Sequence, residues 1–369
     1  MYSKVIASAK NWIESNAIDQ LESIARLPGM RMAIGMPDLH PGKDAPIGAV
    51  FASENIVYPH LIGNDIGCGM TLWQTDLGGG KPKLDKWAKR LSNLEGSWEG
   101  DTRQFLQQAG IDPTPHDKSL GTIGGGNHFA ELQRLTKICD QENTFNIDDQ
   151  FVYLLVHSGS RGFGEQILQA HQAKHGNGGL VAGSKECDEY VTAHDHAVAW
   201  ARANRKLIAL RMLEALGTTA TQILDICHNF VQPGTVDSAN CWLHRKGAAP
   251  SDQGQTVIPG SRGSLSYLVT AAGHQLSNLA TVAHGAGRKW KRSDCRERLR
   301  TKFSEESLLQ TKFGSKIICD DKGLLYEEAP QAYKDIDIVV GDLLEARLIK
   351  VVAIFAPLIT YKTMGRHKV

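Results

Sequence analysis

The sequence predicts a mixed α/β fold, with helices and sheets in one large domain over residues 1–369. Segments of helical periodicity alternate with short aliphatic runs that end in glycine-rich or histidine-bearing turns, a pattern typical of sheets covered by helices. Hydrophobic residues make up 41% and charged residues 22% of the 369 residues, as in ordinary globular proteins. No internal repeat, low-complexity tract or linker divides the sequence.

Four segments can be assigned from periodicity and turn-forming residues. Residues 1–27 are predicted to be a helical entry, because apolar residues recur at helical spacing in their second half. Glycines and prolines interrupt short apolar runs in residues 31–70, which predicts strands and loops. Residues 82–110 and 186–218 are predicted to be helical, and the second segment is the longest helical pattern in the sequence.

Three aliphatic runs are predicted to contain buried strands. They are "FVYLLVHSGSRG" (151–162), "ILDICHNFV" (223–231) and "VVAIFAPLITY" (351–361). Strands that are buried on both faces consist of nearly continuous aliphatic residues. The last run contains Pro357 and is shorter than the roughly 18 apolar residues that a membrane span needs.

Charge and cysteine content limit the class of protein. The net charge is +1, so no overall positive field indicates a nucleic-acid partner. Residues 285–302 contain eight lysines or arginines and two acids, which by themselves indicate a solvated helix face. The seven cysteines form no C-x-x-C pair and no secretory signal is present, which predicts a reduced, cytoplasmic protein that is not bound to a membrane. No oligomerisation pattern is evident, and a monomer is expected.

Histidines at the ends of apolar runs are the first candidate site residues. Four lie where an apolar run meets a glycine-rich or polar turn: His128, His157, His228 and His284. Asp65 and Cys68 lie three residues apart in the glycine-lined segment "GNDIGCGM". One carboxylate, one thiolate and several imidazoles form a credible ligand set for a divalent metal.

Structural roles compete with this interpretation. A single cysteine is commonly a small buried apolar residue, and a single histidine is commonly a hydrogen-bonded core residue. None of the candidate ligands has a diagnostic metal-binding spacing. The pairs His171/His175 and His194/His196 are interpreted as coincidental.

Glycine-rich loops indicate phosphate binding. The segment "GTIGGGNHF" (121–129) offers consecutive backbone N–H groups that could form an anion nest. The sequence contains no G-x-x-x-x-G-K-[ST] P-loop and no lysine in the K-x-D-G setting of nucleotidyl-transferring ligases. If the protein activates a phosphate covalently, a histidine such as His284, followed by the basic run, is a candidate nucleophile.

Seven sequence blocks resemble, in order, the signature blocks of the RtcB family of RNA-splicing ligases. The blocks are "MPDLHPGKDAPIGAVF", "GNDIGCGM", "GTIGGGNHFAEL", "HSGSRG", "PGSRGSLSY", "HGAGR" and "EAPQAYKDIDIVV". They begin at about Met36 and cover most of the remaining sequence. The resemblance implies an RtcB-like fold with central β-sheets flanked by helices.

The resemblance also implies a function. Members of the family use GTP and Mn²⁺, with two ions expected here, to join RNA 3′-phosphate or 2′,3′-cyclic phosphate ends to 5′-hydroxyl ends in RNA repair or tRNA splicing. By resemblance, His284 would attack GTP and become guanylylated. GMP would then pass to the RNA 3′-phosphate to give RNA(3′)pp(5′)G, and the 5′-hydroxyl would displace GMP. A thiolate ligand alone would favour zinc, but the resemblance implies manganese.

Residue roles follow from the matching blocks. The implied metal ligands are Asp65, Cys68, His128, His157 and His228. The implied nucleotide contacts are Asn127, Glu131, Ser261, Ser266, Ala286, Gly287, Arg288, Tyr333 and Lys362. Among these, Asn127 would contact phosphate and Glu131 would contact the guanine edge. The segment around Lys362, "PLITYKTMGRHKV", departs from the usual family tail.

Three further positions depart from the family pattern. "HGAGR" is followed by "KWKR" in place of a Met-Ser-Arg-like sequence, which adds Trp290 and Lys291. Arg262 replaces a common methionine, and Lys43 and Asp44 replace a glycine-rich loop. These departures predict a divergent branch, such as a repair ligase with a narrow RNA substrate. Trp290 would either stack on a base or pack within the protein.

Two other functions compete with ligation. A metal-dependent RNA-end phosphatase or cyclic phosphodiesterase would retain the metal ligands but would not need a guanylylated histidine. A non-catalytic RNA-binding protein would need neither feature. The joint presence of His284, Glu131 and Arg288 favours the ligase.

Overall fold

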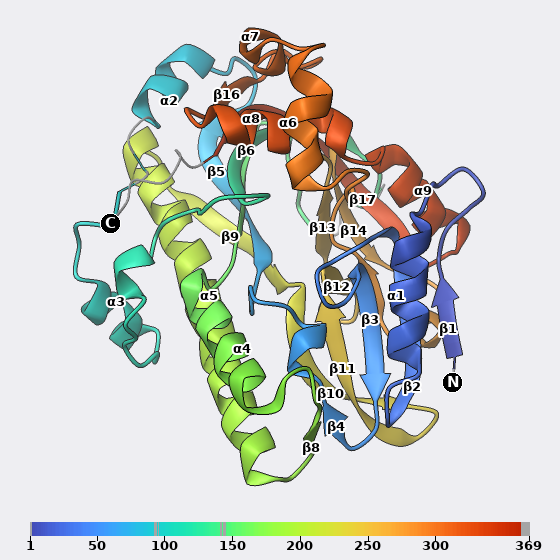
Figure 1. Ribbon diagram of the computed structural model, residues 1–369. Helices are drawn as coiled ribbons and strands as arrows, with labels where there is room; N and C mark the ends of the chain where they lie inside the picture. The colour runs from blue at the N-terminus through green and yellow to red at the C-terminus, as the bar shows by residue number, and fades with distance from the viewer. Residues whose placement is uncertain (1, 92–93, 95, 141, 143–144, 363–369) are drawn as a thin grey trace.

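Two β-sheets form the framework of the molecule (Figure 1). The computed structural model describes residues 2–91, 94, 96–140, 142 and 145–362. The larger, eight-stranded sheet has the order β13-β14-β17-β6-β7-β5-β9, and β16 also pairs with β17. Its strands are β5 (Gly69–Gly78), β6 (Phe129–Ile138), β7 (Phe151–Ser158), β9 (Ala220–Cys227), β13 (Thr256–Pro259), β14 (Ser266–Ala271), β16 (Lys316–Ile318) and β17 (Ile349–Tyr361).

The smaller sheet has five strands in the order β1-β2-β3-β11-β10. These strands are β1 (Tyr2–Val5), β2 (Met30–His40), β3 (Ile47–Ser53), β10 (Asn229–Val236) and β11 (Ala239–Lys246). Two short ribbons complete the described strands, one of β4 (Ile56–Val57) with β8 (Leu180–Val181) and one of β12 (Ala248–Pro250) with β15 (Thr281–Ala283).

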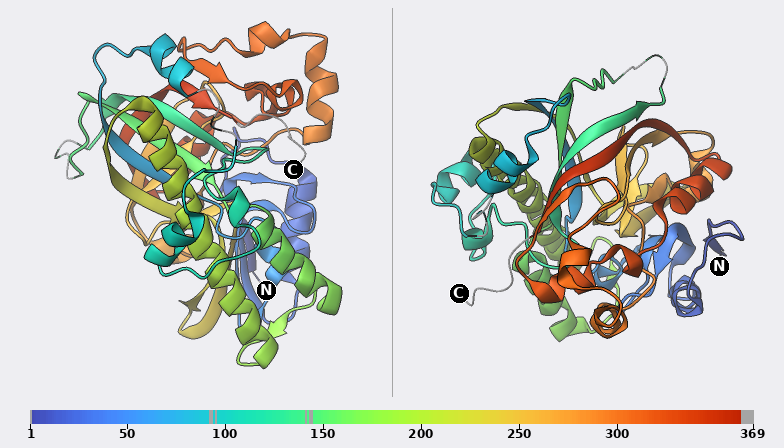
Figure 2. Two further views of the ribbon diagram at one scale, coloured as in Figure 1. Left: turned by 90° about the vertical axis from the view of Figure 1, so that its left-hand side faces the viewer. Right: turned by 90° about the horizontal axis from the view of Figure 1, so that it is seen from above.

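Helices surround the two sheets, some along a sheet face and others over the ends of the strands (Figures 1 and 2). They are α1 (Ser15–Ala25), α2 (Leu84–Arg90), α3 (Thr102–Gln108), α4 (Gly162–His175), α5 (Lys185–Leu216), α6 (Arg292–Arg300), α7 (Glu305–Leu308), α8 (Lys322–Glu327) and α9 (Ile336–Glu345). Short 3-10 turns lie at Pro59–Leu61, Asp117–Ser119, Gln275–Asn278 and Pro330–Ala332. Within the described ranges, no helix combines the length and apolar character needed to cross a bilayer.

The alternation of side chains along the strands explains the layers. In β7, Leu155 packs into the main core between the sheets, whereas Leu154 packs into a second core that includes Met212 of α5. In β3, Val50 joins the main core, whereas Phe51 faces the core beneath α1. Successive strand side chains point to opposite faces, so aliphatic residues at both phases place one layer on each side. The predicted mixed α/β class with flanked central sheets is confirmed.

Most predicted elements are confirmed, and two need correction. The helix predicted over residues 186–218 is α5, which starts after the Ser184 cap and ends at Gly217 in the left-handed conformation. Residues 31–70 form strands and loops, and the three aliphatic runs contribute to β7, β9, β10 and β17. The helical prediction over residues 1–27 is wrong for residues 2–14, because residues 2–5 pair with β2 as β1 and no helix begins before Ser15. This pairing between distant segments overrides local preference.

The helix predicted over residues 82–110 is also interrupted. It forms the separate helices α2 and α3, and residues 96–101 between them are not helical. Gly96 and Gly100 weaken a helix in this interval. The Asp101 side chain accepts a hydrogen bond from the backbone N–H of Gln104, which starts α3 anew.

A buried arginine on α5 connects this helix to the segments that precede β5 and end β7. Arg205 is fully buried, and its guanidinium donates to the carbonyl oxygens of Gly67 at 2.7 Å and Ser158 at 3.0 Å. It also donates from Nε to Asp225 Oδ2 at 3.2 Å. These contacts connect the ends of two segments that carry candidate site residues.

We expect Asp225→Ala to lower the free energy of unfolding by about 3–5 kcal/mol, because it leaves a buried guanidinium without its counter-charge. Denaturant titration measures this change. The matched control is Glu54→Ala, which removes the exposed Arg31–Glu54 pair at 2.6 Å and should change the free energy of unfolding far less. Equal effects of the two substitutions would contradict a stabilising role for the buried Arg205–Asp225 ion pair.

Candidate active site

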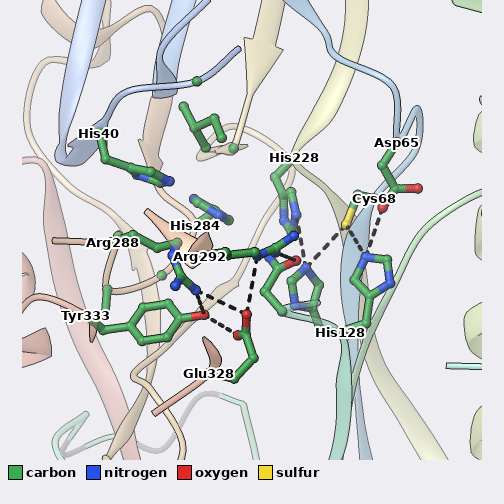
Figure 3. Close-up of a pocket in the computed structure, with 18 of the residues that line it drawn as sticks. His40, Asp65, Cys68, His128, His228, His284, Arg288, Arg292, Glu328 and Tyr333 are labelled. Atoms are coloured by element: carbon green, nitrogen blue, oxygen red, sulfur yellow. Dashed lines mark hydrogen bonds and ion pairs between the residues drawn. The ribbon is translucent and has the colours of Figure 1, made fainter. Parts of the chain in front are cut away.

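A cavity of about 920 Å³ collects residues from both sheets and from the C-terminal third of the chain (Figure 3). The predicted site residues that line it are Asp65, Cys68, Asn127, His128, Glu131, His157, His228, Ser261, His284, Ala286, Gly287, Arg288, Tyr333 and Lys362. Ser266 does not line the cavity. It is buried on β14, where its hydroxyl oxygen accepts a hydrogen bond from Gln133 Nε2 at 2.9 Å.

Three of the predicted metal ligands converge at one end of the cavity. Cys68 Sγ lies 3.3 Å from Nε2 of His128 and 3.3 Å from Nε2 of His157. Among the residues that the structure describes, this is the one group of three or more potential ligands whose donor atoms all lie within 4.8 Å of one another. The group could therefore hold a metal ion.

The other two predicted ligands flank this trio. Asp65 Oδ2 lies 2.8 Å from His128 Nε2, and Nε2 atoms of His157 and His228 are 3.3 Å apart. Asp65 Oδ1 is buried and has no hydrogen-bond partner. A buried oxygen of this kind is costly unless a partner satisfies it, and a cation at this position would do so.

The histidines direct their Nε2 atoms toward the ligand group. His128 Nδ1 lies 3.2 Å from the carbonyl oxygen of Ile123, which directs its Nε2 toward the Cys68 sulfur and the Asp65 carboxylate. Burial lowers the pKa of His157 and His228 well below the ordinary value, and neighbouring histidines lower it further. Neutral imidazoles are the form that binds a metal.

The thiol and the carboxylate also fit a cation. Burial raises the pKa of the Cys68 thiol well above its ordinary value, and the Asp65 carboxylate raises it further. A thiolate here needs positive charge nearby, which a divalent ion supplies. Burial alone would raise the pKa of Asp65, but the adjacent His128 outweighs burial and lowers it.

The two histidine pairs interpreted as coincidental have backbone partners. His171 Nε2 lies 3.1 Å and His196 Nε2 lies 2.9 Å from a backbone carbonyl oxygen. His194 Nε2 accepts a hydrogen bond from a backbone N–H at 3.1 Å. Over the described ranges, neither pair acquires a third side-chain ligand.

His284 follows β15 and is held by a buried carboxylate. Its Nδ1 lies 2.7 Å from Asp38 Oδ2, and its backbone N–H donates to the same oxygen at 3.2 Å. Asp38 is fully buried, and its carboxylate can only accept, so the ring proton lies on Nδ1. The His284 and His228 ring centroids are 4.7 Å apart, and Figure 3 shows His284 between His40 and His228. The Nε2 lone pair of His284 is therefore available next to the ligand group.

Glu131 on β6 is a buried carboxylate that accepts hydrogen bonds. Its Oε1 accepts a hydrogen bond from Gln133 Nε2 at 2.8 Å, and its Oε2 accepts one from the Thr360 hydroxyl. Burial raises the pKa of Glu131 to about 7, although these two hydrogen bonds and Lys362 act to lower it. The carboxylate thus changes charge near neutral pH.

A buried glutamate joins several predicted nucleotide contacts. Glu328 Oε1 pairs with Arg288 Nη1 at 3.1 Å and with Arg292 Nε at 3.4 Å. Its Oε2 lies 3.7 Å from Lys362 Nζ and accepts a hydrogen bond from the Tyr333 hydroxyl. Glu328 therefore fixes the wall of the cavity that these side chains form (Figure 3).

The glycine-rich loop before β6 lies against two arginines. Gly124 has a φ of +93°, and a Cβ there would lie 1.5 Å from Nη1 of Arg161, so only glycine lets this guanidinium pack on the loop. Arg292 Nη2 donates to Asn127 Oδ1 at 3.3 Å. Arg161, Arg292 and Asn127 all line the cavity and form a setting for anions.

The positions that depart from the family pattern lie in or beside the cavity. Arg262 is a buried wall residue whose Nη2 donates to the carbonyl oxygen of Leu325 at 3.2 Å, while its Nε and Nη1 have no partner. Lys43 is exposed at the rim. Trp290 and Lys291 line the rim on the side of α6.

Sequence analysis missed several residues that shape the site. Asp38, His40 and Glu328 lie within blocks that carry the resemblance, and Arg161 is the fifth residue of the block "HSGSRG". His40 Nδ1 lies 2.9 Å from the carbonyl oxygen of Asp38, and burial lowers the pKa of His40 to about 4. The signal that could have found them is the concentration of polar residues within the blocks.

The family model described as tRNA-splicing ligase RtcB matches residues 20–102 and 92–363. The chain belongs to the RtcB family. The RtcB blocks inferred from the sequence are thereby confirmed, and membership makes the chain an RNA ligase by family. The ligand group of Cys68, His128 and His157 is compatible with a metal-dependent member of this family.

Individual RtcB relatives cover nearly the whole chain. It is 48% identical to RNA-splicing ligase RtcB2 of Escherichia coli strain ATCC 25922, over 98% of this chain and 96% of the relative. It is 30% identical to RNA-splicing ligase RtcB of Escherichia coli K12, over 92% and 94% of the two chains. It is 29% identical to tRNA-splicing ligase RtcB of Methanococcus maripaludis, over 89% and 87%.

Proposed function

We propose that this protein is a GTP- and Mn²⁺-dependent ligase that joins RNA 3′-phosphate or 2′,3′-cyclic phosphate ends to 5′-hydroxyl ends. The reaction passes through a His284–GMP intermediate and an RNA(3′)pp(5′)G end. Its roles are RNA repair or tRNA splicing. One observation carries the proposal: the buried Asp38–His284 pair, at 2.7 Å, lies beside a ligand group of one thiol and two imidazoles.

The Asp38–His284 pair supports nucleophilic attack. Asp38 holds the proton of His284 on Nδ1, which leaves the Nε2 lone pair to attack the α-phosphorus of GTP. The new N–P bond forms as the bond from the α-phosphorus to the pyrophosphate oxygen breaks, and pyrophosphate leaves with that electron pair. The imidazole ring gains positive charge in this step, and the Asp38 carboxylate stabilises it.

Asp65, Cys68, His128, His157 and His228 would hold the metal. Their donor set fits, since it combines neutral imidazoles, a thiol that needs positive charge and a buried, unpartnered carboxylate oxygen. When bound, Mn²⁺ supplies charge neutralisation at phosphate oxygens. Two ions are proposed, which these five residues would hold.

Glu131 would recognise guanine by hydrogen bonds, and arginines would bind phosphate. An ionised Glu131 can accept hydrogen bonds from N1–H and the 2-amino group of guanine, a pair of donors that adenine lacks. Asn127 lies beside the cavity-lining arginines and would contact phosphate. Ser261, Ala286, Gly287, Arg288, Tyr333 and Lys362 would complete the nucleotide pocket, with Ser266 acting from behind through Gln133.

The protein is further proposed to act as one ligase domain over residues 1–369, as a monomer and in the cytoplasm. The described structure supports a reducing location, since all seven cysteines are free thiols.

Product analysis tests ligation directly. The protein is incubated with Mn²⁺, GTP, a labelled RNA that ends in a 3′-phosphate and a second RNA with a 5′-hydroxyl. The proposal expects a joined strand whose formation needs GTP. A dephosphorylated 3′ end without joining would support the competing end-trimming function and would refute ligation.

Removal of the central thiol should abolish tight metal binding. We expect Cys68→Ala to weaken Mn²⁺ binding by at least about a hundredfold, since even indirect partners of metal ligands change affinity by about 10–100-fold. Isothermal titration with Mn²⁺ measures this. Cys187→Ala, which removes another buried thiol outside the cavity, is the control. Unchanged affinity in Cys68→Ala would rule out this ligand group.

Guanine binding should depend on pH through Glu131. Its pKa of about 7 means that the accepting carboxylate is lost as pH falls, so affinity for guanosine should drop about tenfold from pH 8 to pH 6. Guanosine is the probe because it has no phosphate that titrates in this range. Glu131→Gln should bind more weakly and show a flat profile. A flat profile for the unmodified protein would refute this role.

A further inference from the structure

Trp12 is an exposed aromatic residue with no evident structural role. It lies in the loop between β1 and α1, and 57% of its surface is accessible. Buried Trp73, Trp87 and Trp200 of the same chain belong to hydrophobic clusters, but Trp12 belongs to none of those found among the described residues. A single exposed apolar side chain needs no explanation by itself, so the surroundings of Trp12 decide whether it has a role.

Trp12 lines a second cavity that adjoins the catalytic one. This cavity has a volume of about 610 Å³ and is lined by Trp12, Glu14, Lys289, Trp290, Lys291, Asp294 and Arg298. Glu14, Lys289, Trp290 and Lys291 line the catalytic cavity as well. The two cavities therefore share a wall.

Trp290, the second tryptophan of this cavity, is held in place. Its backbone carbonyl oxygen accepts a hydrogen bond from Arg288 Nε at 3.1 Å, and the preceding N–H of Lys289 donates to the carbonyl oxygen of Ala332 at 2.7 Å. The guanidinium carbon of Arg298 lies 5.3 Å from the ring centroid of Trp290. The indole is half-buried and packs against the cluster that contains Cys295, Leu299 and Tyr326, so only its accessible part offers a fixed aromatic surface at the mouth of the catalytic cavity.

The charge of the second cavity favours a polyanion. It is lined by three cations, Lys289, Lys291 and Arg298, against the two acids Glu14 and Asp294. Within the described part of the chain, no ion pair occupies these three cations. Exposed arginines of α6 continue the positive surface at Arg296 and Arg300. Aromatic surfaces combined with free cations are the chemistry that binds single-stranded nucleic acids.

We propose that this second cavity, the tryptophan subsite, binds a nucleobase of single-stranded RNA next to the end that reacts at His284. The base stacks on Trp12 and Trp290, and Lys289 and Lys291 lie along the adjoining phosphates. The inference rests on the proposed function for the identity of the polymer. The subsite would bind RNA outside the catalytic cavity without hydrogen bonds to a particular base.

RNA binding without GTP or metal tests the subsite. The probe is a fluorescein-labelled ten-nucleotide RNA with a 3′-phosphate, followed by anisotropy at one fixed salt concentration. We expect Trp12→Ala to weaken binding about tenfold, in line with the known contribution of one stacked base. Trp12→Phe should recover most of the affinity. The control is Tyr2→Ala, which removes an exposed aromatic residue on β1 that lines neither cavity and should bind as the unmodified protein does.

A second variant tests whether both tryptophans act on one base. Trp290→Met keeps the half-buried volume filled but removes the aromatic surface, and it should also weaken binding. Residues that contact the same group couple, so the double variant should lose less than the product of the two single effects. An RNA with abasic sugars near the 3′ end should bind weakly, and Trp12→Ala should weaken it no further.

The outcomes separate the subsite from the proposed function. Equal RNA affinity of Trp12→Ala and the unmodified protein, with both folded by circular dichroism, would overturn the subsite. Guanylylation of the unmodified protein by labelled GTP is measured separately. Its absence would count against the proposed function, while a loss of RNA affinity in Trp12→Ala would still support the subsite.

Discussion

His284→Ala is expected to abolish the transfer of GMP from GTP to the protein. No other described group combines an imidazole, a buried carboxylate partner at 2.7 Å and a place beside the candidate ligand group. Alanine removes the nucleophilic nitrogen, and no neighbouring side chain replaces it. The measurement uses GTP labelled at the α-phosphate with Mn²⁺, followed by detection of label on denatured protein. The label on the unmodified protein should be acid-labile, as expected for a phosphoramidate.

Two controls make this result specific. His274→Ala removes an exposed histidine outside the cavity and should keep full labelling. Mn²⁺ binding by His284→Ala should also persist, because the Cys68, His128 and His157 group is intact. Label on folded His284→Ala protein would show that another residue is the nucleophile.

Asp38→Asn is expected to slow guanylylation by about a hundredfold to ten-thousandfold. The fully buried carboxylate accepts from His284 Nδ1 and from the backbone N–H of the same residue. An amide in its place can donate to Nδ1, which moves the ring proton to Nε2 and blocks the attacking lone pair. Loss of a buried carboxylate behind a catalytic histidine has an effect of up to about 10⁴ in the comparable arrangement of serine proteases.

Single-turnover rates of protein labelling measure the effect of Asp38→Asn. The control Asp252→Asn changes an exposed carboxylate outside the cavity and should leave the rate unchanged. GTP binding in the absence of metal separates a loss of rate from a loss of affinity. A rate close to that of the unmodified protein would mean that Asp38 does not select the tautomer of His284.

The sequence alone predicted the elements whose patterns are locally complete. The aliphatic run in β7 is buried on both faces, so its hydrophobicity was sufficient to assign it. The helix α5 has a serine cap, a long helical pattern and a terminal glycine. β1 could not be predicted in this way, because its four residues are a strand only by pairing with β2.

The candidate site likewise has features that sequence motifs predict and features that depend on tertiary contacts. Motif blocks were enough to nominate His284, Cys68 and the imidazoles, since these residue types keep their chemistry in any fold. The partnership of His284 with Asp38 spans 246 residues of sequence, and Trp12 and Trp290, which line one cavity, lie still further apart in the chain. Such contacts depend on how two sheets pack and on where their strand ends meet. Chemical identity was thus determined by the sequence, whereas proximity, tautomer and burial were decided only by the tertiary structure.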